Sequence, residues 1–152
     1  MNGFGARWAM ACVFVVTTGA AAAPSGGAGI DDARNFDWER KSPADFLDVL
    51  RAQAKLPEYV GTFAAVEVPH AGWVKEADLP GLVALVDSKE RCAHIATPLA
   101  QSLPDTRSFV GQEALVMIQA FRDGTYPPPG LTTSKGFYAR KAEILAWWKA
   151  RP

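Results

Sequence analysis

The sequence predicts an all-α fold, arranged as a compact bundle or a short array of antiparallel helices. Apolar residues recur at helical spacing in several segments, as in Phe46, Val49 and Leu50. Proline or glycine stands where such segments would end, as at Pro57 and Gly124. A serine or an aspartate stands where helices would begin, at positions 42, 78, 88, 108 and 134. We therefore expect about four to six helices within residues 41–152.

The first helix is predicted to begin at Ser42, which can cap it. Pro43 suits the first helical position, and Asp45 stands where the acid of a capping box belongs. Pro57 ends the helix. The next stretch, residues 58–73, is ambiguous. We predict a turn of helix followed by a loop, and a short hairpin is the competing interpretation.

Residues 78–104 are predicted to form a tight αα-hairpin. Asp78 caps its first helix, with Pro80 in the first turn. Ser88 caps an antiparallel second helix that places Cys92 and Ile95 inward and that Pro98 kinks or ends.

The stretch "SFVGQEALVMIQAFRDG", residues 108–124, is the most regular helical segment. Ser108 is the expected cap and Gly124 the expected C-terminal glycine. The following "TYPPPG" favours an extended, polyproline-like strap. A final helix is predicted from Ser134 to the end of the chain.

The stretch "LPGLVALVDSKERCAHIATPLA" joins a leucine-rich helix, a short acidic turn and a second helix with inward Ala and Ile. On this pattern residues 78–124 resemble one and a half units of HEAT-type α-solenoid repeats. The resemblance covers under a third of the chain and implies a binding scaffold without chemistry of its own.

Residues 1–22 have the pattern of a secretory signal peptide. Arg7 supplies a basic start, "WAMACVFVV" is a short apolar run, and small residues lead to a cleavage site after Ala22. We expect a flexible linker over residues 23–40, which Phe36 and Trp38 pin to the domain at its end, and a helical domain over residues 41–152. The mature protein is thus expected in the periplasm or outside the cell, without stable membrane insertion.

Composition argues against nucleic acid as a partner. The chain holds 16 basic and 16 acidic residues, and the basic ones form no long run. Signal removal would leave Cys92 as the only cysteine, so no intramolecular disulfide is expected.

Motifs for metal binding or nucleophilic catalysis are lacking, so we predict no metal, no cofactor and no catalytic residue. His70, Cys92 and His94 do not have the spacing of a zinc site, and Cys92 suits a small buried residue. Glu113 is the acid worth naming. Its place in a first helical turn favours the ionised form, so capping is a better interpretation than catalysis.

The aromatic-rich C-terminal part carries the candidate binding residues Tyr126, Arg140 and Trp147. Exposed aromatic side chains beside an arginine are typical of protein-binding hot spots. The alternative, which the burial needs of a disulfide-free domain favour, is that these aromatic residues pack the proline strap onto the final helix.

These observations together predict an exported helical binding module with a periplasmic protein partner. A small inhibitor or immunity protein is one concrete version. The alternatives are a periplasmic hydrolase acting on cell wall or carbohydrate through dispersed acids, and a structural component of the envelope.

Overall fold

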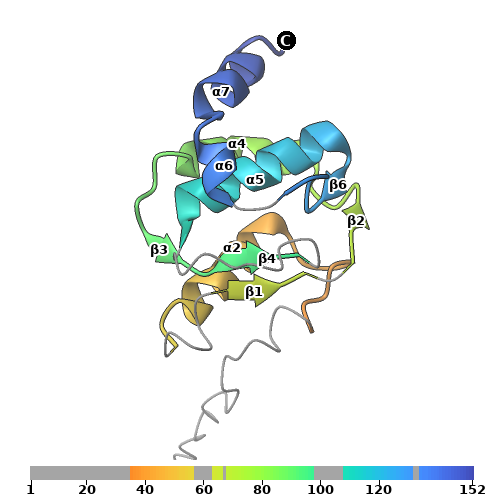
Figure 1. The fold of residues 1–152 in the computed structure, drawn as a ribbon. Helices are drawn as coiled ribbons and strands as arrows, with labels where there is room; N and C mark the ends of the chain where they lie inside the picture. Colours follow the sequence, from red (N-terminus) through yellow and green to blue (C-terminus); the bar gives the residue numbers. More distant parts are fainter. Residues whose placement is uncertain (1–34, 57–62, 67, 98–107, 132–133) are drawn as a thin grey trace, which may run out of the picture.

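The computed structural model describes residues 35–56, 63–66, 68–97, 108–131 and 134–152. Figure 1 shows a mixed arrangement of helices and short strands. The helices are α2 (Pro43–Gln53), α4 (Leu79–Leu85), α5 (Val110–Asp123), α6 (Ser134–Tyr138) and α7 (Lys141–Lys149), and a 3₁₀ turn, η1 (Glu76–Asp78), precedes α4. The predicted signal peptide, residues 1–22, lies outside the described residues, as do residues 57–62 and 98–107.

Three strand pairs make the fold mixed α/β, so the prediction of an all-α fold was wrong. Strand β1 (Phe63–Ala65) runs parallel to β4 (His94–Ala96). Strand β2 (His70–Ala71) runs antiparallel to β6 (Thr125–Tyr126), and β3 (Arg91–Cys92) antiparallel to β5 (Ser108–Phe109). Every pair joins segments that are distant along the chain, which a local pattern cannot reveal.

The predicted αα-hairpin is half correct. Helix α4 is present, but the expected second helix is replaced by β3 and β4. All three residues of β4 are buried, and a short buried run has the same apolar content in a strand as in a helix. The likeness of residues 78–124 to HEAT-type repeats stays a prediction that these elements do not decide.

Residues 63–65 and 70–71 are strands, so the described part of the ambiguous stretch is extended and the predicted helical turn is not found there. The competing hairpin is also absent from this part, because β1 and β2 pair with other strands.

The capping prediction for the first helix is confirmed. The backbone N–H of Ser42 donates to Asp45 Oδ2 at 2.8 Å, and the N–H of Asp45 donates to Ser42 Oγ at 3.3 Å. Gly124 ends α5 in the left-handed conformation with φ +74°, also as predicted.

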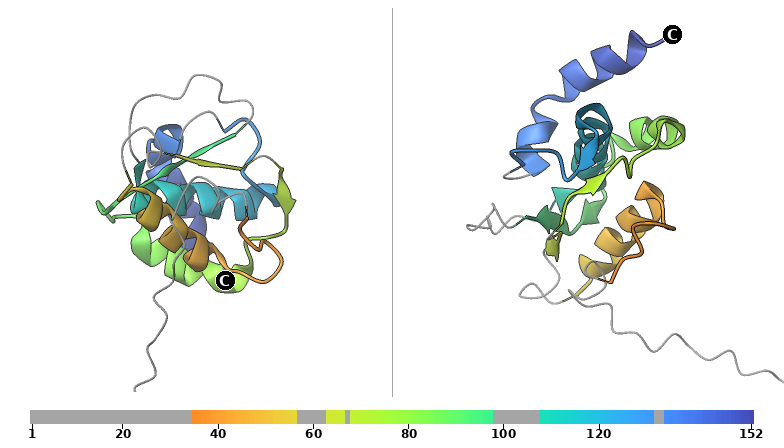
Figure 2. Two further views of the ribbon diagram at one scale, coloured as in Figure 1. Left: turned by 90° about the horizontal axis from the view of Figure 1, so that it is seen from below. Right: turned by 90° about the vertical axis from the view of Figure 1, so that its right-hand side faces the viewer.

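Two predicted helix starts need correction. Ser108 lies in β5, and Phe109 is the N-cap of α5; the Phe109 N–H donates to Gln112 Oε1 at 3.2 Å. The expected single C-terminal helix is two helices, α6 and α7, which break at Ala139 and Arg140. Helix α7 extends away from the body of the domain (Figures 1 and 2).

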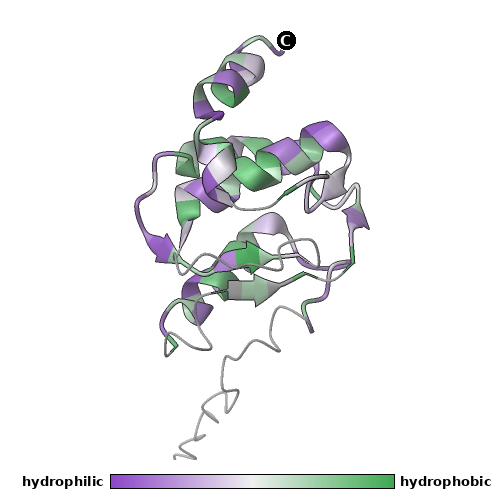
Figure 3. Ribbon diagram, in the orientation of Figure 1, coloured by the Kyte–Doolittle hydropathy of each residue, from purple (hydrophilic) through white to green (hydrophobic). Residues whose placement is uncertain are grey.

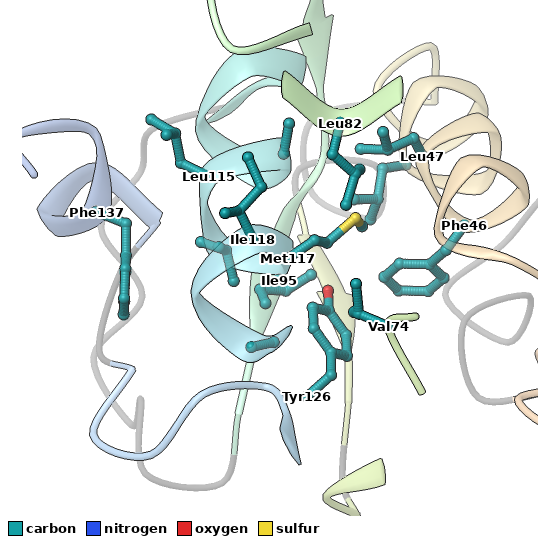
Figure 4. Packing of buried hydrophobic residues seen from close by; sticks show 14 of the residues in the cluster. Phe46, Leu47, Val74, Leu82, Ile95, Leu115, Met117, Ile118, Tyr126 and Phe137 are labelled. Carbon is teal, nitrogen blue, oxygen red and sulfur yellow. The ribbon is translucent and has the colours of Figure 1, made fainter. Parts of the chain in front are cut away.

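Helix α5 is the centre of the core. Ten of its residues are buried, and it packs against α2, α4 and α6. In the close-up it stands between Phe137 of α6 and Phe46 and Leu47 of α2 (Figure 4). Apolar residues follow β1 and β4 and parts of α4 and α5 (Figure 3). The same core extends to an aromatic group near the start of α2, made of Phe36, Trp38, Phe46, Trp73 and Tyr126.

Candidate functional site

A groove of about 640 Å³ lies where residues 38–43 meet residues 69–78. The first segment turns just before α2, because Asp37 Oδ1 accepts the backbone N–H groups of Glu39 and Arg40 at 3.3 and 3.2 Å. The second segment is held at its other end, where the N–H of Gly72 donates to the carbonyl of Gly124 at 2.8 Å. Gly72 has φ +60°, a conformation that glycine adopts without strain.

The indole of Trp73 connects the two segments. Trp73 is almost fully buried, and its Nε1–H donates to the carbonyl of Lys41 at 3.0 Å. This hydrogen bond satisfies the one polar group of a buried tryptophan. It also fixes the distance between the walls of the groove before any ligand arrives.

An aromatic platform forms one wall. The ring of Trp38 is stacked on His70, with centroids 4.0 Å apart and planes 14° from parallel. Beneath it Trp38 touches Phe36 and Trp73 edge-on at 4.8 Å each, and Phe46 at 4.9 Å. Trp38 stays partly exposed, so it combines a fixed position with an accessible surface. The predicted pinning of this segment by Phe36 and Trp38 is confirmed.

The rim of the groove has more available positive than negative charge. Arg40, Lys41 and Lys75 are exposed, and all three line the groove. Of the two acids there, Asp78 already accepts the N–H of Lys75 through Oδ2 at 2.8 Å. That hydrogen bond orients Asp78 but leaves its charge in place, so Glu39 and Asp78 face three cations and the lining has one more positive than negative charge. Burial lowers the pKa of His70, so the imidazole under Trp38 is neutral near pH 7.

A second, smaller groove of about 270 Å³ adjoins the first one. It runs between α2 and α4 and is lined mainly by aliphatic side chains, among them Leu47, Leu82 and Leu85. The two grooves share Pro43 and Asp78. A ligand that occupies both grooves would contact aromatic and basic groups at one end and aliphatic side chains at the other.

The predicted binding residues are not brought together in one exposed patch. Tyr126 is 1% exposed and packs on Trp73 with centroids 4.8 Å apart. Trp147 lies on α7 between the guanidinium groups of Arg122 and Arg151, at 5.2 and 4.9 Å from its ring. Arg140 lies over the ring of Phe137 at 5.7 Å, and its Nε is 3.3 Å from Glu143 Oε2.

The groove was missed because its walls come from distant segments. "WERK" and "PHAGW" each place a tryptophan beside basic, proline or glycine residues. Aromatic residues in such loop-forming stretches are the signal that could have found the site.

Glu113 has the opposite environment to the expected one. It is fully buried, and burial raises its pKa to about 7, while the nearby hydroxyls of Ser108 and Ser134 act to lower it. Helix capping, the predicted role, belongs instead to Gln112. Cys92 is fully buried as predicted, and burial raises the pKa of its thiol far above the ordinary value.

The chain matches no known protein-family model, no curated protein and no solved structure. Among the described residues, no three His, Cys, Asp or Glu side chains are grouped to hold a metal ion. No helix in the described part of the chain is both long and apolar enough to cross a membrane. The function is therefore argued from the grooves and their charges.

Proposed function

We propose that this chain is an exported binding module that holds an acidic segment of a protein partner in the groove beside Trp38. A small inhibitor or immunity protein of the periplasm is the class that fits this role. The observation that carries the proposal is the Trp38–His70 stack, an accessible aromatic platform with Arg40, Lys41 and Lys75 around it.

The platform supplies affinity at low entropic cost. Tryptophan and arginine dominate protein-binding hot spots, because they contribute a large contact area and charge-assisted hydrogen bonds. Trp38 is already held by Phe36, Phe46 and Trp73. Little further side-chain freedom is lost on binding, so most of the contact energy remains available.

The charges select the partner. Cations that outnumber the free acids attract carboxylates and repel basic segments. The aliphatic groove between α2 and α4 continues from the same site. The preferred ligand is therefore a segment with clustered Asp or Glu and a leucine-like side chain a few residues away.

The experiment measures binding by calorimetry between the purified protein and a synthetic acidic peptide that ends in leucine. A second peptide with lysine in place of each acid is the matched probe. We expect binding of the acidic peptide only, and weaker binding as salt is raised, because exposed charges are screened. Equal binding of both peptides, or of neither, would exclude the proposed recognition.

Charge-removal variants locate the binding. Arg40→Gln removes a rim cation whose one ion pair, with Asp37 at 3.9 Å, is exposed. Lys135→Gln removes an equally exposed cation from α6 and is the control. We expect Arg40→Gln, combined with Lys41→Gln, to weaken binding roughly tenfold, and Lys135→Gln to leave it unchanged. The wild type, the double variant and Lys135→Gln can also be compared as bait in a periplasmic extract. A true partner should bind the wild type and Lys135→Gln equally well and the double variant less well.

A further inference from the structure

A buried carboxyl group lies outside the lining of both grooves. Glu113 belongs to the first turn of α5 and is 0% exposed. Its surroundings come from four other elements. Ser108 of β5 and Ser134 of α6 are close enough to act on its carboxyl group, and the carboxyl group in turn acts on Cys92 of β3 and Tyr126 of β6.

These neighbours are polar but uncharged near neutral pH. Neither oxygen of Glu113 has a hydrogen-bond partner of regular geometry among the described residues, and the same holds for Ser134 Oγ and Tyr126 Oη. Ser108 Oγ donates its proton to Gln112 Oε1 at 3.0 Å. The Ser108 and Ser134 hydroxyls act to lower the pKa of Glu113, but burial has the larger effect and favours the protonated acid.

Cations on the surrounding elements are engaged elsewhere. Arg51 of α2 acts on Cys92, but it is paired with Asp48 at 2.8 Å and Glu90 at 2.9 Å. On α7, Lys141 pairs with Asp87 and Glu143 pairs with Arg122. Lys135 of α6 is exposed, and α4 carries no charged residue between Leu79 and Leu85. Among the residues that the structure describes, a carboxylate at position 113 would therefore be a buried charge without a counterion, which is costly.

We propose that Glu113 is a proton-controlled switch: α6 stays packed against α5 while the buried carboxyl group is protonated, and α6 separates from α5 when the group ionises. Helix α6 is the element that yields, because it has only five residues and presents only Ser134 and Phe137 to the interior. The strands on the other side are held by backbone pairing, β3 with β5. Movement of α6 is the least costly way to bring water to the carboxylate.

The direction with pH follows from burial. The pKa of Glu113 is raised from 4.5 to about 7 in the folded protein. A group of this kind contributes its full stability below pH 4.5, and that contribution is lost as pH rises toward and through 7. Each pKa unit corresponds to a tenfold change in equilibrium constant. The closed state of α6 should thus weaken on the order of a hundredfold between about pH 4.5 and pH 8.

The test is amide hydrogen exchange in the full chain, corrected for the intrinsic effect of pH. In the wild type, protection of the Arg140 amide, which donates to the carbonyl of Phe137 at 3.0 Å, should fall by about tenfold or more from pH 6 to pH 8. The Ala54 amide at the end of α2 donates to Leu50 at 3.2 Å and is the internal control that should not change. In Glu113→Gln, which cannot ionise, both amides should keep constant protection.

A second measurement does not depend on the variant folding. The carboxyl carbon of Glu113, followed by NMR in the isotope-labelled wild type, should titrate near pH 7. Titration near pH 4.5 would overturn the proposal, and so would loss of α6 protection in Glu113→Gln equal to that in the wild type. Both readouts are independent of the groove, so they can succeed or fail separately from the proposed binding function.

Discussion

The indole of Trp38 lies flat on the imidazole of His70. Trp38 precedes α2 and His70 follows β1, so the fold brings two distant segments together. The stack is supported from below by Phe36, Phe46 and Trp73. Trp38 is thus held in position while its side chain stays partly exposed. Such a ring contributes to binding without needing to be ordered first.

Replacement of Trp38 should separate binding from folding. Trp38→Ala is expected to cost about 2 kcal/mol or more in affinity for the acidic peptide, because a central tryptophan is a typical hot spot. Calorimetry measures this loss, and urea unfolding reports the accompanying loss of stability. Trp148→Ala on α7 is the control, since Trp148 is a half-buried tryptophan away from both grooves. An equal loss of affinity in both variants would place the binding site elsewhere.

Two local signals in the sequence predicted local structure correctly. Ser42 and Asp45 stand three residues apart and form the capping box, and Gly124 takes the left-handed conformation after α5. Each of these features depends on residues within one helical turn, so a short stretch contains all the information.

Features that depend on distant residues were missed. Ile95 is apolar in either a helix or a strand, and only its pairing with Ala64 through β1 and β4 makes it a strand residue. The groove likewise requires Trp73 to reach the carbonyl of Lys41. Both contacts join residues that are distant along the chain, so no short stretch of sequence reveals them. The tryptophans in "WERK" and "PHAGW" are the local signal that lies in the segments of the groove.

The prediction that Glu113 is an ionised capping residue was wrong for a different reason. It stands three residues after Val110 and four before Met117, so helical spacing alone places it on the buried face of α5. The helix dipole, which was given more weight, contributes only about 0.3–1 kcal/mol near a surface. Burial of a carboxylate costs considerably more, so the position on the helix decides the pKa.

Gly111 should be irreplaceable at the contact between α5 and the end of α4. A Cβ built there would lie 2.6 Å from the carbonyl oxygen of Val86 and 2.8 Å from that of Ser88. Both are backbone atoms, so relief requires the helices to separate. We expect Gly111→Ala to lower the free energy of unfolding by about 1–3 kcal/mol, as measured in urea.

Gly81→Ala is the matched control in α4. A Cβ at Gly81 meets nothing within 4 Å, and alanine in a helix interior is favoured over glycine by roughly 0.5–1 kcal/mol. This variant should therefore be slightly stabilised. The same sign of change in both variants would contradict the close approach of α5 to Val86.

Arg151 should contribute to the attachment of α7 through Phe121 and Glu76. Its guanidinium group lies 4.9–5.8 Å from the rings of Phe121, Trp147 and Trp148, and it pairs with Glu76. Few other side chains of α7 are buried, Ile144 being the exception. Arg151→Ala should cost about 1 kcal/mol and raise hydrogen exchange in α7 several-fold. Lys149→Ala, which removes an exposed cation of the same helix, should leave the exchange unchanged.

The pH dependence of stability should contain two opposed contributions. Burial lowers the pKa of His70 and His94, so their neutral forms stabilise the fold, and this stability is lost as pH falls below 6.5 toward their lowered values. Glu113 acts in the opposite direction, because its raised pKa removes stability as pH rises toward and through 7. Asp45 and Glu143 have lowered pKa values and titrate below about pH 4.5, outside this range.

In Glu113→Gln the contribution of the histidines to the pH dependence of stability should therefore be seen by itself. Urea unfolding between about pH 5 and pH 8 should show stability that rises up to about pH 6.5 and then stays level, because the histidines no longer titrate above that range. In the wild type Glu113 should oppose this rise, because its contribution to stability is lost between about pH 4.5 and pH 7, and the resulting decline should level off above about pH 7. The double variant Glu113→Gln with His94→Gln should lose less stability below pH 6.5, since the more buried of the two imidazoles is removed. A decline of the single variant above pH 7 would show that another buried acid, and not Glu113, controls the alkaline side.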